Sequence, residues 1–106
     1  MDVAATRWSR AKARAKFRKM PFEVSLDDFR NIITSPCVYC KGPITGEGGG
    51  MDRLDNSRGY ELDNVSPCCT ECNRVRSSTY TPEEMRRVLG TAMRIIRFFR
   101  GFGRRN

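Results

Sequence analysis

The chain has 106 residues, of which 39% are apolar, five are cysteine and none is histidine, and its formal net charge is +8. A chain of this length forms one domain with a modest core, often stabilised by a bound metal or disulfides, and its apolar content excludes wholesale disorder. No run approaches the roughly 18 apolar residues that would span a bilayer, and no apolar run follows the basic N-terminus as in a secretory signal. We therefore expect a cytoplasmic protein that does not enter a membrane.

The positive charge is concentrated at the two ends of the chain. Residues 1–20 contain seven Lys or Arg and one acidic residue, and residues 82–106 contain seven Arg and two acidic residues. Residues 21–81 contain six basic and nine acidic residues, so the middle is net negative. This distribution favours a protein that contacts phosphates with its ends and binds cations in its middle, although charge that serves solubility alone stays open.

Residues 3–19 predict a helix that ends before Pro21, because the segment is rich in alanine and contains neither glycine nor proline. Basic side chains occur on every face, so we expect this helix to bury little surface. Nucleic acid is the expected partner. The candidate phosphate contacts are its seven basic residues, Arg7, Arg10, Lys12, Arg14, Lys16, Arg18 and Lys19.

The middle of the chain predicts a short helix and two short strands. The helix begins after Ser25 as N-cap, is apolar on one side, and ends before Pro36. Residues 42–50 are rich in glycine, and we expect them to be flexible. Strands are predicted around residues 50–54 and 64–67, joined by a long polar loop.

A C-terminal amphipathic helix is predicted from residue 82 onward. Thr81 supplies an N-cap, Pro82 occupies the first helical position, and Glu84 completes a capping box. A stripe at helical spacing predicts core packing by Met85, Val88, Leu89, Ala92, Ile96 and Phe99. A second apolar surface, formed by Ile95, Phe98 and Phe102, leaves a homodimer open.

Two CxxC pairs, Cys37–Cys40 and Cys69–Cys72, predict a metal site. Cysteine pairs in a chain without a secretory signal indicate metal binding more than disulfides. Four cysteine ligands predict one tetrahedral Zn²⁺, structural because no coordination position stays open. The 28 residues between the pairs exceed the spacing of a simple zinc ribbon, so we expect a further folded unit there. Cys68 is an alternative to Cys69, but its spacing to Cys72 is poorer, so we assign it to packing.

The stretch from Asp52 to Asn73 has the pattern DRxDNxxGYxxxNVxPCCxxCN, which resembles the HNH (ββα-metal) endonucleases. Small phage and homing members with a four-cysteine zinc are the most similar, and the resemblance covers about residues 17–85. It implies an α+β fold in which a β-hairpin and a helix clasp one catalytic divalent ion, with further helices on either side. It also implies metal-dependent DNA cleavage, as nicks or double-strand cuts, in a bacterial or phage-infected cell. We expect residues 1–20 to be a DNA-binding helix and residues 21–106 to be the zinc-bound nuclease domain.

The resemblance assigns roles to single residues in this stretch. It implies that Asp52, at the end of the first strand, and Asn73, directly after the last cysteine, bind the catalytic metal. Asn64 matches the central Asn of the family, which orders the loop through backbone hydrogen bonds. An oxygen-only ligand pair that leaves sites for water suits Mg²⁺ or Mn²⁺.

Arg53 departs from the family pattern, which has histidine at this position as the general base. Arginine cannot accept the proton, because its guanidinium does not deprotonate in proteins. In one interpretation Tyr60 or metal-bound water accepts it, while Arg53 binds the scissile phosphate and stabilises developing charge. In the other, catalysis is lost, and the chain is an inactive DNA-binding zinc module or an accessory of a phage DNA-processing complex.

Overall fold

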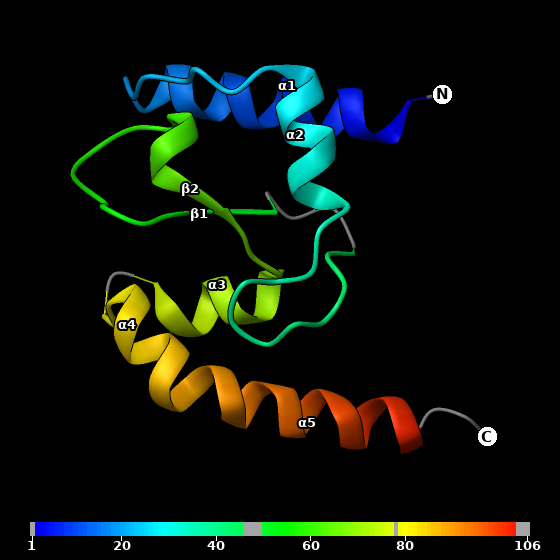
Figure 1. The fold of residues 1–106 in the computed structure, drawn as a ribbon. Coiled ribbons are helices and arrows are strands. Elements are labelled where there is room, and N and C mark those ends of the chain that lie inside the picture. Colours follow the sequence, from blue (N-terminus) through cyan, green and yellow to red (C-terminus); the bar gives the residue numbers. More distant parts are fainter. Residues whose placement is uncertain (1, 46–49, 78, 104–106) are drawn as a thin grey trace.

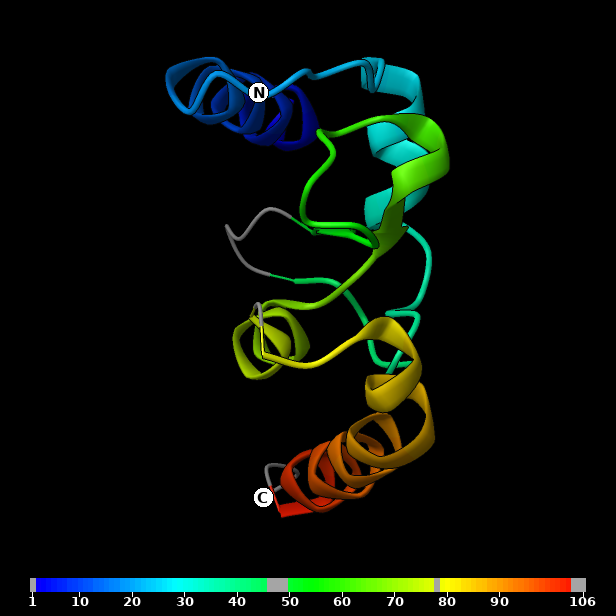
Figure 2. The ribbon, with the colours of Figure 1, turned by 90° about the vertical axis from the view of Figure 1, so that its left-hand side faces the viewer.

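The computed structural model describes residues 2–45, 50–77 and 79–103. Helices and one small sheet form a mixed fold, which confirms the predicted α+β class. In chain order the elements are α1 (Val3–Phe17), α2 (Leu26–Ile33), β1 (Met51–Arg53), a 3₁₀ turn (Leu62–Asn64), β2 (Val65–Pro67), α3 (Thr70–Arg76), α4 (Pro82–Glu84), a π-helical turn (Met85–Leu89) and α5 (Gly90–Gly103). Two perpendicular views place α1 and α2 at one end, the β1–β2 hairpin in the middle, and α3 and then α5 toward the other end (Figure 1, Figure 2).

Helix α1 is part of the hydrophobic core, so the expectation that it buries little surface is wrong. Ala11 and Ala15 are 6% and 1% exposed, and the Trp8 indole N–H donates a hydrogen bond to the Val24 carbonyl at 2.8 Å. Residues four apart lie on one face of a helix, so these alanines make a narrow stripe that α2 can approach closely. The functional division at residue 20 remains a prediction.

Helix α2 and the hairpin follow their sequence signals. Ser25 caps α2, with its Oγ accepting from the Asp28 backbone N–H at 3.1 Å. β1 and β2 pair antiparallel in the predicted region, with Asp52 opposite Ser66. Gly50 enters β1 with φ 75°, and a Cβ on it would lie 2.8 Å from a methyl carbon of Ile33, so glycine is required there. Residues 46–49 of the glycine-rich segment lie outside the described part.

Two clusters of buried side chains lie on either side of the hairpin. The apolar core consists of Ala11, Val24, Phe29 and Met51, with Trp8, Phe22, Ile32, Ile33, Tyr60 and Val65 packed around it. The sulfur core consists of Cys37, Tyr39, Cys40, Cys68, Cys69, Cys72 and Met85, with Val38, Leu89 and Met93 packed around it. A backbone hydrogen bond of 2.9 Å from Val38 to Pro67 ties the sulfur core to β2.

The C-terminal helix confirms its predicted start but not its predicted packing. Thr81 and Glu84 form the capping box with hydrogen bonds of 2.8 and 3.1 Å. Met85, Leu89 and Met93 contact the sulfur core, whereas the stripe residues Val88, Ala92 and Ile96 are exposed. The π-helical turn shifts the helical period, and the rest of α5 extends past the core. The side chains of Phe99 and Phe102 lie outside the described part, within which no helix is long and apolar enough to cross a bilayer.

Candidate metal centre and active site

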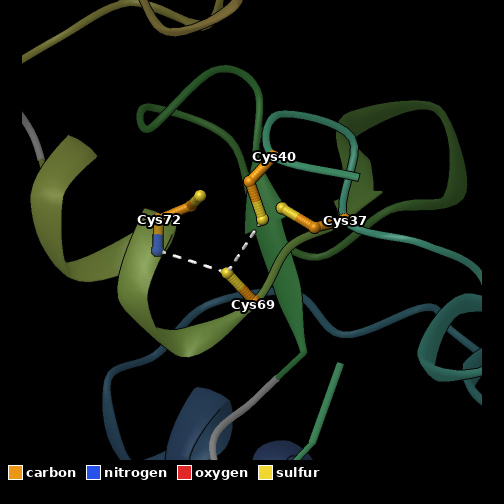
Figure 3. Close-up of side chains that lie close together, drawn as sticks. All are labelled: Cys37, Cys40, Cys69 and Cys72. Atoms are coloured by element: carbon orange, nitrogen blue, oxygen red, sulfur yellow. Dashed lines mark hydrogen bonds between the residues drawn. The ribbon is translucent and has the colours of Figure 1, made fainter. Parts of the chain in front are cut away.

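The four cysteines of the two CxxC pairs converge on one point (Figure 3). All four are buried, and their sulfur atoms lie within 4.8 Å of one another. The sulfurs of Cys40 and Cys69 are 3.7 Å apart, close to the edge of about 3.8 Å expected for a tetrahedron with metal–sulfur bonds of about 2.3 Å. The donor set and its geometry therefore fit, and these cysteines could bind a metal such as zinc.

Backbone N–H groups donate to two of the four sulfurs. Gly42 N–H donates to the Cys40 sulfur and Cys72 N–H donates to the Cys69 sulfur, each at 3.4 Å. Lys41 turns the chain with φ 64°, which brings Gly42 back onto its knuckle. Donors directed at sulfur favour thiolates, the form in which cysteine binds metal.

The four thiols influence one another's ionisation. The pKa of Cys37 is lowered because neighbouring thiols, Cys68 first among them, donate hydrogen bonds to its sulfur. The pKa of Cys72 is raised because its proton is held by Cys37 and Cys69 and because the thiol is buried. Formation of one thiolate therefore disfavours formation of the next, and a bound divalent cation would supply the positive charge that four thiolates need.

Cys68 lies beside the four-sulfur cluster but is not one of its members, which agrees with its assignment to packing. It is fully buried, and its sulfur makes a long contact of 3.4 Å to the Cys69 carbonyl. Its hydrogen bond to Cys37, followed by burial, raises its pKa, so Cys68 remains a protonated thiol.

The second knuckle also begins helix α3. Cys69 is the N-cap, which places Asn73 one turn into the helix. The Asn73 amide nitrogen donates a long hydrogen bond, 3.4 Å, to the Met51 carbonyl at the start of β1. The α3 helix thus faces the hairpin across a short gap.

A polar cavity of about 370 Å³ opens between α1, the hairpin and α3. It brings together four of the five predicted catalytic and catalytic-metal residues and one predicted phosphate contact, Arg18. Its lining is Arg18, Met51, Asp52, Arg53, Asn56, Tyr60, Asn73 and Ser77. A smaller concavity of about 190 Å³ shares Met51, Tyr60 and Asn73 and is also lined by Ala11 and Arg14. Residues from both ends of the predicted motif therefore line one cavity, and helix α1 borders it.

The seven basic residues of α1 and the two positions that follow it do not share one environment. Arg14 and Arg18, one turn apart, line the two concavities. Arg7 is 8% exposed, with its guanidinium carbon 6.0 Å from the centre of the Phe29 ring, so it is poorly placed for phosphate contact. The side chains of Arg10, Lys12, Lys16 and Lys19 are exposed outside the cavity lining.

Asp52 is buried and has two partners that sequence reasoning missed. Its Oδ2 accepts a hydrogen bond of 2.5 Å from the Tyr39 hydroxyl, and its Oδ1 pairs with the guanidinium of Arg76. Burial, then the hydrogen bond to Asp52, raises the pKa of Tyr39, which keeps the hydroxyl protonated as a donor. One signal was available, because Arg76 follows Asn73 by three residues and residues at this spacing share a helix face.

Arg53 and Tyr60 lie against each other in the lining of the cavity. One Arg53 nitrogen donates to the carbonyls of Asn56 and Arg58 at 2.7 and 2.8 Å, which fixes the guanidinium over the loop. Its carbon lies 5.5 Å from the centre of the Tyr60 ring. The Tyr60 backbone is held in turn by hydrogen bonds of 2.9 Å to Pro21 and 2.7 Å from Glu23.

The fold of this chain is similar to the solved structure of the rare-cutting HNH restriction endonuclease PacI, with a TM-score of 0.76 and 23% sequence identity. The match covers 92% of this chain and 81% of PacI. The chain has the HNH-type fold. In sequence, it is 28% identical over 76 residues to the uncharacterised protein R423 of Acanthamoeba polyphaga mimivirus, and the match spans 72% of this chain but 14% of the viral protein. No family model matches the sequence.

Asn64 does not line the cavity. Its side chain instead holds the loop of this HNH-type fold through hydrogen bonds to the backbone. Its side chain is 1% exposed, accepts from the Asp55 N–H at 2.9 Å, and donates to the carbonyls of Asp55 and Gly59 at 3.0 and 2.9 Å. Gly59 packs so closely on Pro21 that a Cβ would lie 2.6 Å from the Pro21 carbonyl oxygen. The loop that follows Arg53 and leads to Tyr60 is therefore held by these contacts with its backbone.

Proposed function

We propose that this chain is a metal-dependent DNA endonuclease that hydrolyses phosphodiester bonds. The observation that carries the proposal is the cavity in which Asp52, Arg53, Tyr60 and Asn73 meet beside the four-cysteine cluster, on an HNH-type fold. The net charge of +8 supports a polyanionic substrate. The cytoplasmic location expected from the sequence remains part of this proposal.

Two metal sites have different tasks in this proposal. The four cysteines hold a structural zinc ion, because such a set leaves no position for substrate. Asp52 and Asn73 hold Mg²⁺ or Mn²⁺, for which a carboxylate and an amide oxygen are suitable ligands. The Asn73 nitrogen is engaged with Met51, which leaves the side-chain oxygen as the acceptor, and Asp52 keeps lone pairs beyond its two hydrogen bonds. When bound, this ion supplies positive charge that polarises the phosphate and stabilises the leaving oxygen.

Arg53 binds the scissile phosphate in this account. Its guanidinium is anchored through one nitrogen by two loop carbonyls, and the remaining N–H groups are donors for phosphate oxygens. A donor already fixed in place costs no reorganisation when charge develops on the phosphate. Tyr60, packed beneath it, can relay the proton of the attacking water, because its oxygen can accept that proton while its own O–H proton passes to solvent in the cavity.

Arg14 and Arg18 extend the phosphate contacts from the cavity onto helix α1. Neither side chain has a hydrogen bond or an ion pair within the residues that the structure describes, and both line the concavities that contain Tyr60 and Asn73. We infer that the cleaved strand passes between α1 and the hairpin. The exposed basic residues of α1 outside the cavity add contacts that do not depend on sequence.

A second function is favoured by Arg53, which cannot act as the usual histidine base. The chain would then be a catalytically inactive DNA-binding zinc module or an accessory protein of a phage DNA-processing complex. It would bind DNA with the same basic residues and would not cleave it.

Incubation with supercoiled plasmid distinguishes the two functions. We expect the zinc-loaded protein to produce open circular or linear DNA with Mg²⁺ or Mn²⁺ and none with EDTA at a concentration that leaves zinc bound. Asp52→Ala should abolish cleavage while DNA binding without Mg²⁺ is retained. Plasmid that stays supercoiled with Mg²⁺, Mn²⁺ and Co²⁺ would favour the binding module.

A further inference from the structure

Three buried polar side chains meet at one end of the sulfur core. Tyr39, Asp52 and Arg76 are 2%, 3% and 3% exposed. Tyr39 donates to one oxygen of the Asp52 carboxylate and Arg76 to the other, so both oxygens are fixed in direction. Only Asp52 of the three lines the cavity, which places the other two behind it.

Both partners of Asp52 belong to the metal knuckles. Tyr39 lies inside the first CxxC pair, immediately before Cys40. Arg76 is the last residue of α3, the helix that Cys69 caps and that contains Cys72 in its first turn. The four-sulfur cluster therefore fixes the two segments from which the Asp52 carboxylate is held.

Arg76 also holds the backbone of the catalytic strand. It donates to the carbonyls of Arg53 at 2.8 Å and Leu54 at 3.3 Å, at the end of β1. Its Nε is buried without a hydrogen-bond partner in the described structure, an arrangement that is poor for stability. Buried ion pairs in general contribute little stability compared with apolar packing. The buried cluster of Tyr39, Asp52 and Arg76 is thus better explained by a role in positioning the carboxylate than by a contribution to the stability of the fold.

We propose that Tyr39 and Arg76 are positioning residues that hold the Asp52 carboxylate for the divalent ion and thereby couple the four-cysteine cluster to the active site. The inference rests on the proposed function, because it takes Asp52 as a ligand of that ion. Groups that hydrogen-bond to a metal ligand fix its orientation, and their loss typically lowers metal affinity or activity by about 10- to 100-fold.

The test measures Mn²⁺ binding by the zinc-loaded protein, from the loss of the free Mn²⁺ signal in electron paramagnetic resonance. Tyr39→Phe removes one hydroxyl and keeps the ring, and Arg76→Lys keeps the charge but cannot reach all its acceptors at once. Matched controls are Tyr80→Phe and Arg74→Lys, since Tyr80 is 39% exposed and Arg74 lies exposed on the same helix. Elemental analysis reports zinc in every variant.

We expect Tyr39→Phe and Arg76→Lys to keep one zinc per chain and to weaken Mn²⁺ binding by about 10-fold or more. Both controls should bind Mn²⁺ like the wild type. Unchanged Mn²⁺ binding in the two variants would overturn the proposal. Loss of zinc from both variants would also overturn it, because the contacts of Tyr39 and Arg76 would then serve only to hold the two CxxC knuckles. A wild-type protein that binds no Mn²⁺ overturns it too. If the wild type binds Mn²⁺, the variants bind it more weakly and plasmid is not cut, the positioning role stands and the nuclease function fails.

Discussion

The two cores of this molecule have different chemistry. Helices α1 and α2, which contribute to the apolar core, lie on one side of the short hairpin, and α3, which contributes to the sulfur core, lies on the other (Figure 1). The apolar core joins α1 and α2 to β1 through ordinary packing of alanine, valine, methionine and phenylalanine. The sulfur core contains five cysteines and only one large, fully buried apolar side chain, Met85. The first can form by the hydrophobic effect alone, whereas the second depends on whatever holds its sulfurs together.

Strand β1 connects the two cores residue by residue. Side chains alternate along a strand, and here Met51 enters the apolar core while Asp52 contacts Tyr39 in the sulfur core. Arg53 turns back toward Tyr60, which packs on the apolar core. In the proposed site, the metal ligand Asp52 is thus supported by the sulfur core, and the phosphate-binding residue Arg53 is supported through Tyr60 by the apolar core.

The largest effect is expected from removing the metal ligands of the sulfur core. Cys37→Ser combined with Cys69→Ser should lose zinc and most of the folded structure, because structural zinc sites contribute on the order of 10 kcal/mol. Elemental analysis and circular dichroism report the two losses. Cys68→Ala is the matched control and should keep one zinc per chain, because Cys68 lies outside the cluster. Full folding of the double variant without zinc would show that the sulfur core, like the apolar core, forms without a bound metal.

A smaller effect is expected in the apolar core. Phe29 is fully buried, so Phe29→Ala should lower the free energy of unfolding by about 3–5 kcal/mol while the zinc content stays at one per chain. Phe17→Ala is the control, because Phe17 is 88% exposed and exposed positions change stability by about 0.5 kcal/mol or less. Urea denaturation measures both. Zinc loss in folded Phe29→Ala would show that the two cores are not independent.

These two cores also explain which parts of the structure could be predicted from the sequence. The two CxxC pairs, the short strands and the caps at Ser25 and Thr81 are local signals, set by residue type and spacing and, for the caps, by hydrogen bonds within four residues. The packing of α1 and the exposure of Val88 depend on which face meets the rest of the chain, and that is not encoded locally. Likewise, the contacts of Asp52 with Tyr39 and Arg76 bridge 13 and 24 residues.

The packing of α1 changes how its role in DNA binding should be tested. Deleting the helix would remove Ala11 and Ala15 from the interior, so point variants are needed. Arg14→Gln with Arg18→Gln should reduce the salt dependence of DNA affinity by about two units of slope and should also slow cleavage of bound DNA. Lys12→Gln with Lys16→Gln, outside the cavity, should reduce the slope similarly with cleavage of bound DNA unchanged. Equal rates of cleavage of bound DNA by the two double variants would contradict a path of the DNA strand along the cavity.

The smallest effect on the folded monomer is expected on α5. Ile95 and Phe98 are 54% and 67% exposed, and both belong to the second apolar surface that the sequence offers for a homodimer. Ile95→Asp with Phe98→Asp should change the unfolding free energy by about 1 kcal/mol or less. If the protein is a dimer in sedimentation velocity, the double variant should be a monomer. A dimer that survives both changes would exclude this surface as the interface.

The central claim is that this chain cleaves DNA with arginine at position 53, and the direct measurement is the plasmid cleavage rate of four proteins side by side. We predict that the wild type cuts with Mg²⁺ or Mn²⁺, that Asp52→Ala does not, and that Arg53→Ala is slower by about 100-fold or more. Arg53→His is the fourth protein of the series and restores a side chain that can accept a proton. A wild type that fails to cut with Mg²⁺, Mn²⁺ or Co²⁺, where Arg53→His does cut, would contradict the account and assign the chain to DNA binding alone.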